Sequence, residues 1–276
     1  MKTLAGKRLY LLDMDGTLYL GDRLFKDAPR FLQVIRESGA DYCYVSNNSS
    51  RGTGAYVARL KRMGIEAFPE EFLTSTDAAI DLLKREQPGR KGFAVGTASM
   101  LGQLRDAGLD VSGEEWEDAE YLLIGFDREL TYRKIEDTCR LLAARPDIPY
   151  YATNPDWVCP TEFGAVPDCG SICEMIARAT GCRPRVIGKP EKAMIELAMQ
   201  RYGVSPEETV VVGDRVYTDI ASGVNAGVDS IFVLSGEGVR EDIKRFGYDP
   251  TWIFPSVSEA ADAVAEAVRI NKKTTV

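Results

Sequence analysis

The feature that most constrains the fold is the alternation of short apolar runs with longer amphipathic stretches along the chain. The apolar runs have the length of strands, and they are Leu9–Leu12, Tyr42–Val45, Phe93–Val95, Tyr121–Ile124, Val186–Ile187, Val210–Val212 and Ile231–Leu234. Between them, apolar residues recur at helical spacing, as in Glu191–Tyr202, where Met194 and Ala198 share one face. This alternation predicts an α/β fold with a mostly parallel, Rossmann-like sheet that helices cover on both faces.

Two stretches rich in helix- and strand-breaking residues, 87–90 (QPGR) and 181–184 (GCRP), set off the middle of the chain. The residues between them have strand and helix signals of their own, which is typical of an inserted domain. We therefore expect a core domain made of residues 1–81 and 186–276, with an α/β cap domain at residues 82–185 inserted into it.

The chain contains no histidine, which excludes every mechanism that needs an imidazole. Ser-His-Asp and Cys-His nucleophile activation, phosphohistidine chemistry and His-ligated metals are therefore ruled out. Acid–base chemistry near neutral pH must then use carboxylates, Lys, Tyr, Cys or a metal-bound water. The net charge of −8 disfavours a nucleic acid as the main partner, but a small anionic substrate fits a pocket that concentrates a cation and a lysine.

The six cysteines are not spaced like a disulfide framework in a chain of this length. Near the N-terminus the only apolar run is Leu9–Leu12, which Asp13 interrupts, so we expect neither a signal peptide nor a membrane span. These features predict a cytoplasmic protein without a membrane partner.

Two carboxylates, Asp13 and Asp15, follow the first apolar run and precede Gly16. Because side chains alternate along a strand, both carboxylates project from the same side at its carboxyl end, where α/β sheets bind ligands. Neighbouring carboxylates repel each other unless a cation neutralises them, so the pair favours a hard divalent cation such as Mg²⁺. Alone, the motif is equally compatible with a solvated turn or a helix cap.

Polar residues suited to phosphate binding follow two other predicted strands. Ser46, Asn47 and Asn48 begin a cluster of hydroxyl and amide groups that can hold phosphate oxygens. Lys189 lies at a strand–helix junction, where it can neutralise a phosphate as a point charge. Each could by itself be an ordinary turn or surface residue, so their significance rests on their shared position at strand ends.

Two more carboxylates follow the predicted strand Val210–Val212. Asp214 comes at the strand end and could complete a metal site made of carboxylates. Asp219 lies a few residues further on and could orient Lys189 or a metal-bound water. Four sets of chemically active residues thus fall at the ends of predicted strands, and this coincidence is far more specific than any one of them.

The ordered motifs DMDGT (13–17), SNNSS (46–50), GKP (188–190) and GDRVYTD (213–219) resemble the haloacid dehalogenase superfamily of aspartate-nucleophile phosphatases. The inserted segment, with GFDR (125–128) and ATNPD (152–156), resembles the NagD/4-nitrophenyl phosphatase branch, whose members have a large α/β cap. The resemblance extends over nearly the whole chain, from about residue 9 to about residue 255.

The resemblance implies a role for each core residue. Asp13 would be the nucleophile that forms an aspartyl-phosphate, and Asp15 would protonate the leaving alcohol and then deprotonate the hydrolytic water. Mg²⁺ would be held by the Asp13 side chain, the Asp15 backbone carbonyl and Asp214, while Lys189 and Ser46 would bind the phosphate oxygens. Since a carboxyl group has a reference pKa of about 3.9, Asp13 is expected to be ionised at neutral pH without a base.

The remaining candidates have supporting roles by the same resemblance. Asp219 would be the supporting carboxylate, and Asn48 would lie beside the phosphate. Substrate specificity is expected from the cap, where Asn154, Asp156 and Cys159 are candidate substrate contacts. The sequence Asn-Pro-Asp is also a common turn, which leaves a purely structural role open. A homodimer formed through the cap is a further expectation.

We therefore expect a Mg²⁺-dependent phosphatase of small phosphomonoesters: sugar phosphates, nucleoside monophosphates, phosphoglycolate or aryl phosphates. The alternatives are a phosphomutase or phosphotransferase with the same nucleophile, and a catalytically silent metabolite-binding or signalling protein. The presence of Asp15 disfavours a haloalkanoate dehalogenase, and the inserted segment disfavours a single-domain receiver protein. A silent protein would be expected to have lost a carboxylate, yet all four are present.

Overall fold

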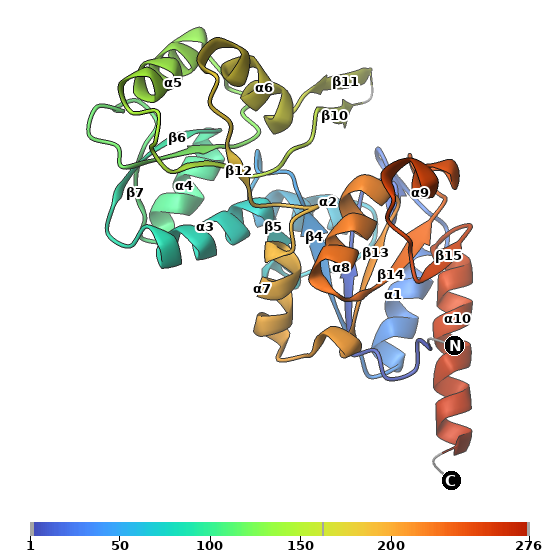
Figure 1. The fold of residues 1–276 in the computed structure, drawn as a ribbon. Coiled ribbons are helices and arrows are strands. Elements are labelled where there is room, and N and C mark those ends of the chain that lie inside the picture. The colour runs from blue at the N-terminus through green and yellow to red at the C-terminus, as the bar shows by residue number, and fades with distance from the viewer. Residues whose placement is uncertain (1–2, 162, 275–276) are drawn as a thin grey trace. The chain divides into compact units, whose positions relative to one another are not determined.

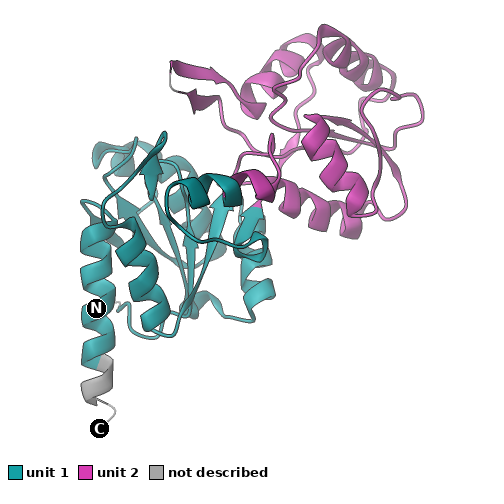
Figure 2. Ribbon diagram, turned by 180° about the vertical axis from the view of Figure 1, so that it is seen from behind, with its two compact units in different colours: residues 1–46, 57–73, 189–276 teal, residues 47–56, 74–188 magenta. Residues whose placement is uncertain are grey.

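The computed structural model describes the backbone of residues 3–161 and 163–274, and side chains as far as residue 270. The chain divides into two compact units, which Figures 1 and 2 show. Unit 1 contains residues 1–46, 57–73 and 189–276, and unit 2 contains residues 47–56 and 74–188. The expected insertion at residues 82–185 lies within unit 2, which begins earlier in the chain and also includes residues 47–56.

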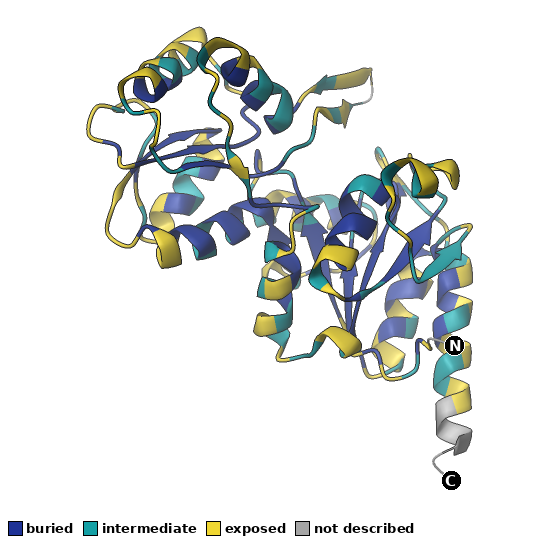
Figure 3. Cartoon of the chain, in the orientation of Figure 1, coloured by how far each residue is buried: buried dark blue, intermediate teal, exposed yellow. Residues whose placement is uncertain are grey.

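Unit 1 is built on a six-stranded sheet in the order β15-β14-β13-β1-β4-β5. The strands are β1 (Leu9–Leu12), β4 (Asp41–Ser46), β5 (Phe72–Thr74), β13 (Thr209–Gly213), β14 (Asp229–Val233) and β15 (Trp252–Phe254). Strand β1 pairs in parallel with β13 on one side and with β4 on the other. All residues of β1 and β13 are buried, as expected for the centre of a sheet covered on both faces (Figure 3).

Helices cover both faces of this sheet. They are α1 (Ala28–Glu37), α2 (Thr53–Arg62), α7 (Ala193–Tyr202), α8 (Ala221–Ala226), α9 (Glu241–Phe246) and α10 (Val257–Thr274). Helix α1 packs against α10 and α7 packs against α8, and the two pairs lie on opposite faces (Figures 1 and 2). In α1 the buried residues Phe31, Leu32 and Ile35 recur at helical spacing, which confirms the amphipathic pattern read from the sequence.

A tight turn and a short hairpin follow β1. The hairpin consists of β2 (Tyr19–Leu20) and β3 (Arg23–Leu24), which pair antiparallel. The amide of Gly16 donates to the Tyr19 carbonyl at 2.7 Å, which closes the turn that carries Asp15. Gly16 has φ +94°, and a Cβ there would lie 2.3 Å from the Asp214 Oδ2 atom, so only glycine fits.

Unit 2 has its own five-stranded parallel sheet in the order β12-β9-β8-β6-β7. The strands are β6 (Lys91–Val95), β7 (Asp110–Ser112), β8 (Tyr121–Ile124), β9 (Tyr150–Ala152) and β12 (Arg185–Val186), and the helices are α3 (Ser75–Glu86), α4 (Ala98–Asp106), α5 (Tyr132–Ala144) and α6 (Cys169–Thr180). A separate antiparallel hairpin joins β10 (Val158–Thr161) to β11 (Gly164–Pro167). Both units are therefore α/β, which confirms the predicted fold class.

Two further expectations can be compared with the described residues. None of the helices in the described ranges is both long and apolar enough to cross a membrane. No disulfide joins the six cysteines, all of which lie in the part of the chain that the structure describes.

Candidate active site

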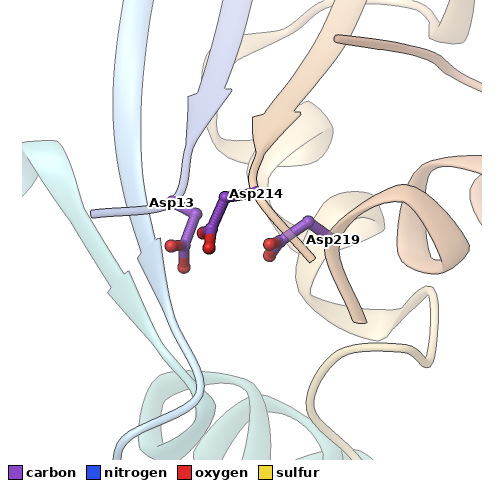
Figure 4. Close-up of side chains that lie close together, drawn as sticks. All are labelled: Asp13, Asp214 and Asp219. Atoms are coloured by element: carbon purple, nitrogen blue, oxygen red, sulfur yellow. The ribbon is translucent and has the colours of Figure 1, made fainter. Parts of the chain in front are cut away.

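Parallel pairing brings two carboxylates together at the carboxyl edge of the unit 1 sheet. Leu12 of β1 lies opposite Val212 of β13, and the Asp13 amide donates to the Val212 carbonyl at 2.8 Å. Asp13 and Asp214 therefore leave neighbouring strands side by side (Figure 4). Oxygen atoms of Asp13, Asp214 and Asp219 all lie within 4.8 Å of one another, which makes this group a candidate metal site.

Lys189 is held between two of these carboxylates. Its Nζ donates to Asp13 Oδ1 at 2.8 Å, to Asp219 Oδ1 at 2.6 Å and to the Val45 carbonyl at 3.2 Å. Only 4% of its side chain is exposed. Burial disfavours the ammonium ion, but the two carboxylates outweigh this effect and raise the pKa of Lys189 above its usual value. The lysine therefore stays positively charged next to Asp13.

The carboxylates carry more negative charge than Lys189 can balance. Burial raises the pKa of Asp13 to about 8, Lys189 opposes the rise, and the charges of Asp219 and Asp214 add to it. Burial and the charge of Asp219 likewise raise the pKa of Asp214 to about 6. The sequence-based expectation that Asp13 is ionised at neutral pH took no account of this burial, which raises the pKa of Asp13 when no cation is bound. A bound divalent cation would favour the ionised form of both groups.

Asp214 is positioned by contacts that sequence reasoning missed. Thr17 donates its hydroxyl proton to Asp214 Oδ1 at 3.3 Å, and the Glu237 amide donates to Oδ2 at 2.8 Å. A Cβ at Gly236 would lie 2.0 Å from Oδ2, so the loop after β14 touches the carboxylate with its backbone. The glycines of this loop, next to the predicted strand Ile231–Leu234, are the sequence feature from which this contact with Asp214 could have been predicted.

Asp219 uses both of its carboxylate oxygens within the site. It lies in the π-helical turn η3 (Val216–Ile220), where Oδ2 accepts from the Arg215 amide at 3.1 Å and Oδ1 accepts from Lys189. A Cβ at Gly213 would lie 2.3 Å from the Asp219 carboxyl carbon, which shows how closely η3 approaches β13. This geometry suits a group that holds Lys189 in place.

The Asp15 side chain is not a member of the group of three carboxylates, and 40% of it is exposed. Its Oδ2 lies 3.8 Å from Nη1 of Arg59, a residue on α2 that sequence reasoning did not single out. Burial raises the pKa of Asp15. The rise is opposed by the charges of Arg59 and Arg215 and by a hydrogen bond with the Gly21 backbone. A carboxyl group with a raised pKa retains its proton more readily, as a proton donor must.

Ser46 is the last residue of β4, next to β1 in the sheet, and it is half-buried at the same edge. The predicted residues that follow it belong to unit 2. Asn47 donates through Nδ2 to Asp156 Oδ2 at 3.1 Å, and its carbonyl accepts from Asn154 Nδ2 at 2.9 Å. The Asn47 carbonyl also accepts from Ser75 Oγ at 2.5 Å. The segment after Ser46 is thus tied to unit 2 by several hydrogen bonds.

The predicted cap residues form one cluster with Asn47 and Asn48. Asn48 Nδ2 lies 3.9 Å from Cys159 Sγ, a distance typical of a weak hydrogen bond to sulfur. The Asp156 amide donates to Asn154 Oδ1 at 2.9 Å, as in the turn that the sequence also allowed. The structure therefore brings the five predicted residues of unit 2 together, with Asn154 completely buried.

Comparisons with known proteins show the family to which the chain belongs. Family models for a haloacid dehalogenase-like hydrolase and a HAD-hydrolase-like domain match residues 10–110 and 186–260. The acid sugar phosphatase of Staphylococcus aureus is 34% identical over 253 residues, which are 92% of this chain and 96% of that protein.

Two solved structures extend the likeness over nearly the whole chain. The 4-nitrophenylphosphatase of Thermotoga maritima superposes with a TM-score of 0.88 and 35% identity, covering 95% of this chain and 98% of that one. NagD from Escherichia coli K-12 superposes with a TM-score of 0.83 and 30% identity, covering 92% and 98%. The chain therefore belongs to the haloacid dehalogenase-like hydrolases, and within them to the NagD-like phosphatases that hydrolyse small phosphoesters.

Proposed function

We propose that this phosphatase is Mg²⁺-dependent, forms an aspartyl-phosphate on Asp13 and acts mainly on sugar phosphates. The observation that carries the proposal is the contact between Lys189 Nζ and Asp13 Oδ1 within a group of three carboxylates. It pairs a nucleophile with a cation that can bind the phosphate under attack. The acid sugar phosphatase of S. aureus supports sugar phosphates as the substrate class, and the T. maritima relative supports activity on aryl phosphates.

The donor atoms of the site fit Mg²⁺. Asp13, Asp214 and the backbone carbonyl of Asp15 offer hard oxygen ligands. Among the described residues, Asp214 has no lysine contact that would compete with a metal. When bound, the ion would shield the nucleophile from the negative charge of the phosphate. We assign Asp219 to holding Lys189, because both Asp219 oxygens already accept hydrogen bonds from other groups.

The proposed reaction has two steps that share these residues. First, an Asp13 oxygen attacks phosphorus while the bond to the leaving oxygen breaks, and Asp15 gives that oxygen a proton. Second, Asp15 removes a proton from a water molecule, which attacks phosphorus and releases Asp13 and inorganic phosphate. Lys189 and the Ser46 hydroxyl bind the phosphate oxygens in both steps. No histidine is needed at any stage.

We assign unit 2, with residues 82–185, to a cap that selects the leaving group. The cluster of Asn47, Asn48, Asn154, Asp156 and Cys159 supports this, because its first member directly follows Ser46 in the chain. In this proposal the cluster fixes the loop after Ser46 and presents polar groups to the substrate.

A homodimer formed through the cap is part of the proposal. The β10–β11 hairpin supports it, because Trp157, Val158 and Phe163 are exposed there by 60%, 52% and 82%. Light scattering on the Phe163→Ser variant tests this assembly, since loss of the dimer is the expected result. We place the enzyme in the cytoplasm, in keeping with six cysteines that form no disulfide.

Phosphate release from a panel of sugar phosphates, nucleoside monophosphates, phosphoglycolate and 4-nitrophenyl phosphate tests the catalytic proposal. Activity should require Mg²⁺, disappear with EDTA and fall at least about a thousandfold in Asp13→Asn. Asp106→Asn, which removes an exposed carboxylate from α4, is the matched control and should leave turnover unchanged. Equal phosphate release by Asp13→Asn would refute the nucleophile, and transfer to an added alcohol without phosphate release would favour a phosphotransferase.

A further inference from the structure

Arg59 makes four contacts with the segment that carries Asp15. Its Nη2 donates to the Gly21 carbonyl at 2.7 Å, and its guanidinium carbon lies 4.5 Å from the centre of the Tyr19 ring. Its Nη1 lies 3.8 Å from Asp15 Oδ2, and its Nε lies 3.8 Å from Asp22 Oδ1. One side chain of α2 therefore contacts both the hairpin and the proposed proton donor.

The hairpin needs such support because its strands, β2 and β3, contain only two residues each. A two-stranded hairpin is at best marginally stable by itself. The Tyr19 carbonyl also accepts the Gly16 amide at 2.7 Å, so the position of Tyr19 is coupled to the backbone next to Asp15. Stacking on Tyr19 thus fixes the Asp15 backbone, and the guanidinium group, 3.8 Å from Asp15 Oδ2, limits where the carboxyl group can move.

We propose, on the basis of the function proposed above for Asp15, that Arg59 is a positioning residue that holds the Asp15 carboxyl group in place for proton transfer to the leaving oxygen. Arginine suits this role because its planar fork can stack on a ring and donate in two directions at once. The ammonium group of a lysine cannot stack on the Tyr19 ring and donate to the Gly21 carbonyl in the same conformation.

A positioning role for Arg59 predicts a dependence on the leaving group that a purely structural role would not produce. An alkoxide is a poor leaving group and needs a proton as the bond to phosphorus breaks, whereas 4-nitrophenolate is a stable anion that leaves without one. Misplacing Asp15 should therefore impair hydrolysis of alkyl phosphates, such as sugar phosphates, far more than hydrolysis of 4-nitrophenyl phosphate. The relevant constant is kcat/KM, because it includes only the steps up to departure of the leaving group.

The experiment compares kcat/KM for an accepted hexose phosphate and for 4-nitrophenyl phosphate in the Mg²⁺-loaded enzyme. In Arg59→Met we expect a fall of about tenfold or more for the sugar phosphate and of less than about threefold for the aryl phosphate. The ratio of the two constants does not depend on the folded fraction of the sample, so a loss of stability cannot imitate the result. Arg62→Met, which removes an exposed arginine from the same helix, is the matched control and should leave the ratio unchanged.

Two further variants make the outcomes distinct. Arg59→Lys should behave like Arg59→Met, and full rescue by lysine would overturn the positioning role in favour of charge alone. Asp15→Asn should raise the aryl-to-alkyl ratio most of all. A raised ratio in Asp15→Asn together with an unchanged ratio in the Arg59 variants would refute the role of Arg59. An unchanged ratio in Asp15→Asn would instead refute the proposed function of Asp15 as the proton donor.

Discussion

The Nζ atom of Lys189 lies 2.8 Å from Oδ1 of Asp13, although the two residues are 176 positions apart in the chain. Lys189 reaches this position from the loop before α7, and Asp13 from the end of β1. The positive charge of Lys189 is needed next to Asp13 because a buried carboxylate and an incoming phosphate repel each other. Their contact places a fixed positive charge beside the nucleophile.

Replacing Lys189 with methionine should therefore abolish most of the activity. We expect kcat/KM to fall by about 10²- to 10³-fold, since a buried cation that binds the phosphate is lost. The pKa of Asp13 should rise further, because Lys189 is the main group that lowers it. Steady-state kinetics with 4-nitrophenyl phosphate measures the first effect. A variant with nearly wild-type turnover would show that Lys189 does not contact the phosphate.

Stabilisation of the protein by Mg²⁺ should increase between pH 6 and pH 8, the values to which burial raises the pKa of Asp214 and Asp13. A carboxyl group with a raised pKa in the folded state holds a proton that the unfolded chain has already lost. The cation-free protein therefore loses stability as the pH rises through this range. Mg²⁺ binds the ionised groups, so its effect on Tm should grow over the same range.

Thermal unfolding with Mg²⁺ and with EDTA at several pH values measures this difference. The Asp214→Asn variant is the control, because it removes one ligand and one titrating group together. A shift in Tm that is constant or shrinks from pH 6 to pH 8 would contradict the raised pKa values of the two groups.

Gly236→Ala should weaken metal binding. A Cβ at this position would lie 2.0 Å from Asp214 Oδ2, so the carboxylate or the loop must move. We expect an affinity for Mg²⁺ that is lower by about tenfold or more, as for changes in groups that orient a metal ligand. Isothermal titration calorimetry with Mg²⁺ measures the affinity directly.

Gly102→Ala is the matched control for that substitution. Gly102 lies inside α4, and nothing lies within 4 Å of a Cβ built there. Alanine should stabilise the helix by about 0.5–1 kcal/mol without changing the affinity for Mg²⁺. An unchanged affinity in Gly236→Ala as well would mean that the loop relaxes without disturbing Asp214.

Asn154→Ala should lower both stability and substrate affinity. The completely buried Asn154 side chain donates to the Asn47 carbonyl and accepts from the Asp156 amide. Removing it should cost about 1–3 kcal/mol of unfolding free energy, measured by urea denaturation. We also expect KM for sugar phosphates to rise, because Asn47 directly follows Ser46. An unchanged KM would exclude this cluster from substrate binding.

The elements that were predicted well are those whose signal is local. Strands β1 and β8 were predicted with the observed bounds, because each is a continuous apolar run of four buried residues. Strands β5, β7, β9 and β15, each of three residues, were missed. Such short strands form because a neighbouring strand in the sheet already offers its backbone for pairing.

The sequence by itself determined which chemical groups stand at the strand ends, because a strand, its turn and the residue that follows are encoded within a few positions. It was enough to predict the α/β class, the family, and Asp13, Asp15, Lys189 and Asp214 as the residues to examine. Only the tertiary structure decided how these groups affect one another. The raised pKa of Asp13 depends on residues far away in the chain. The same holds for the close approach of Gly236 to Asp214 and for the contact of Arg59 with Asp15. Burial and electrostatic coupling depend on such distances in space, and no local pattern records them.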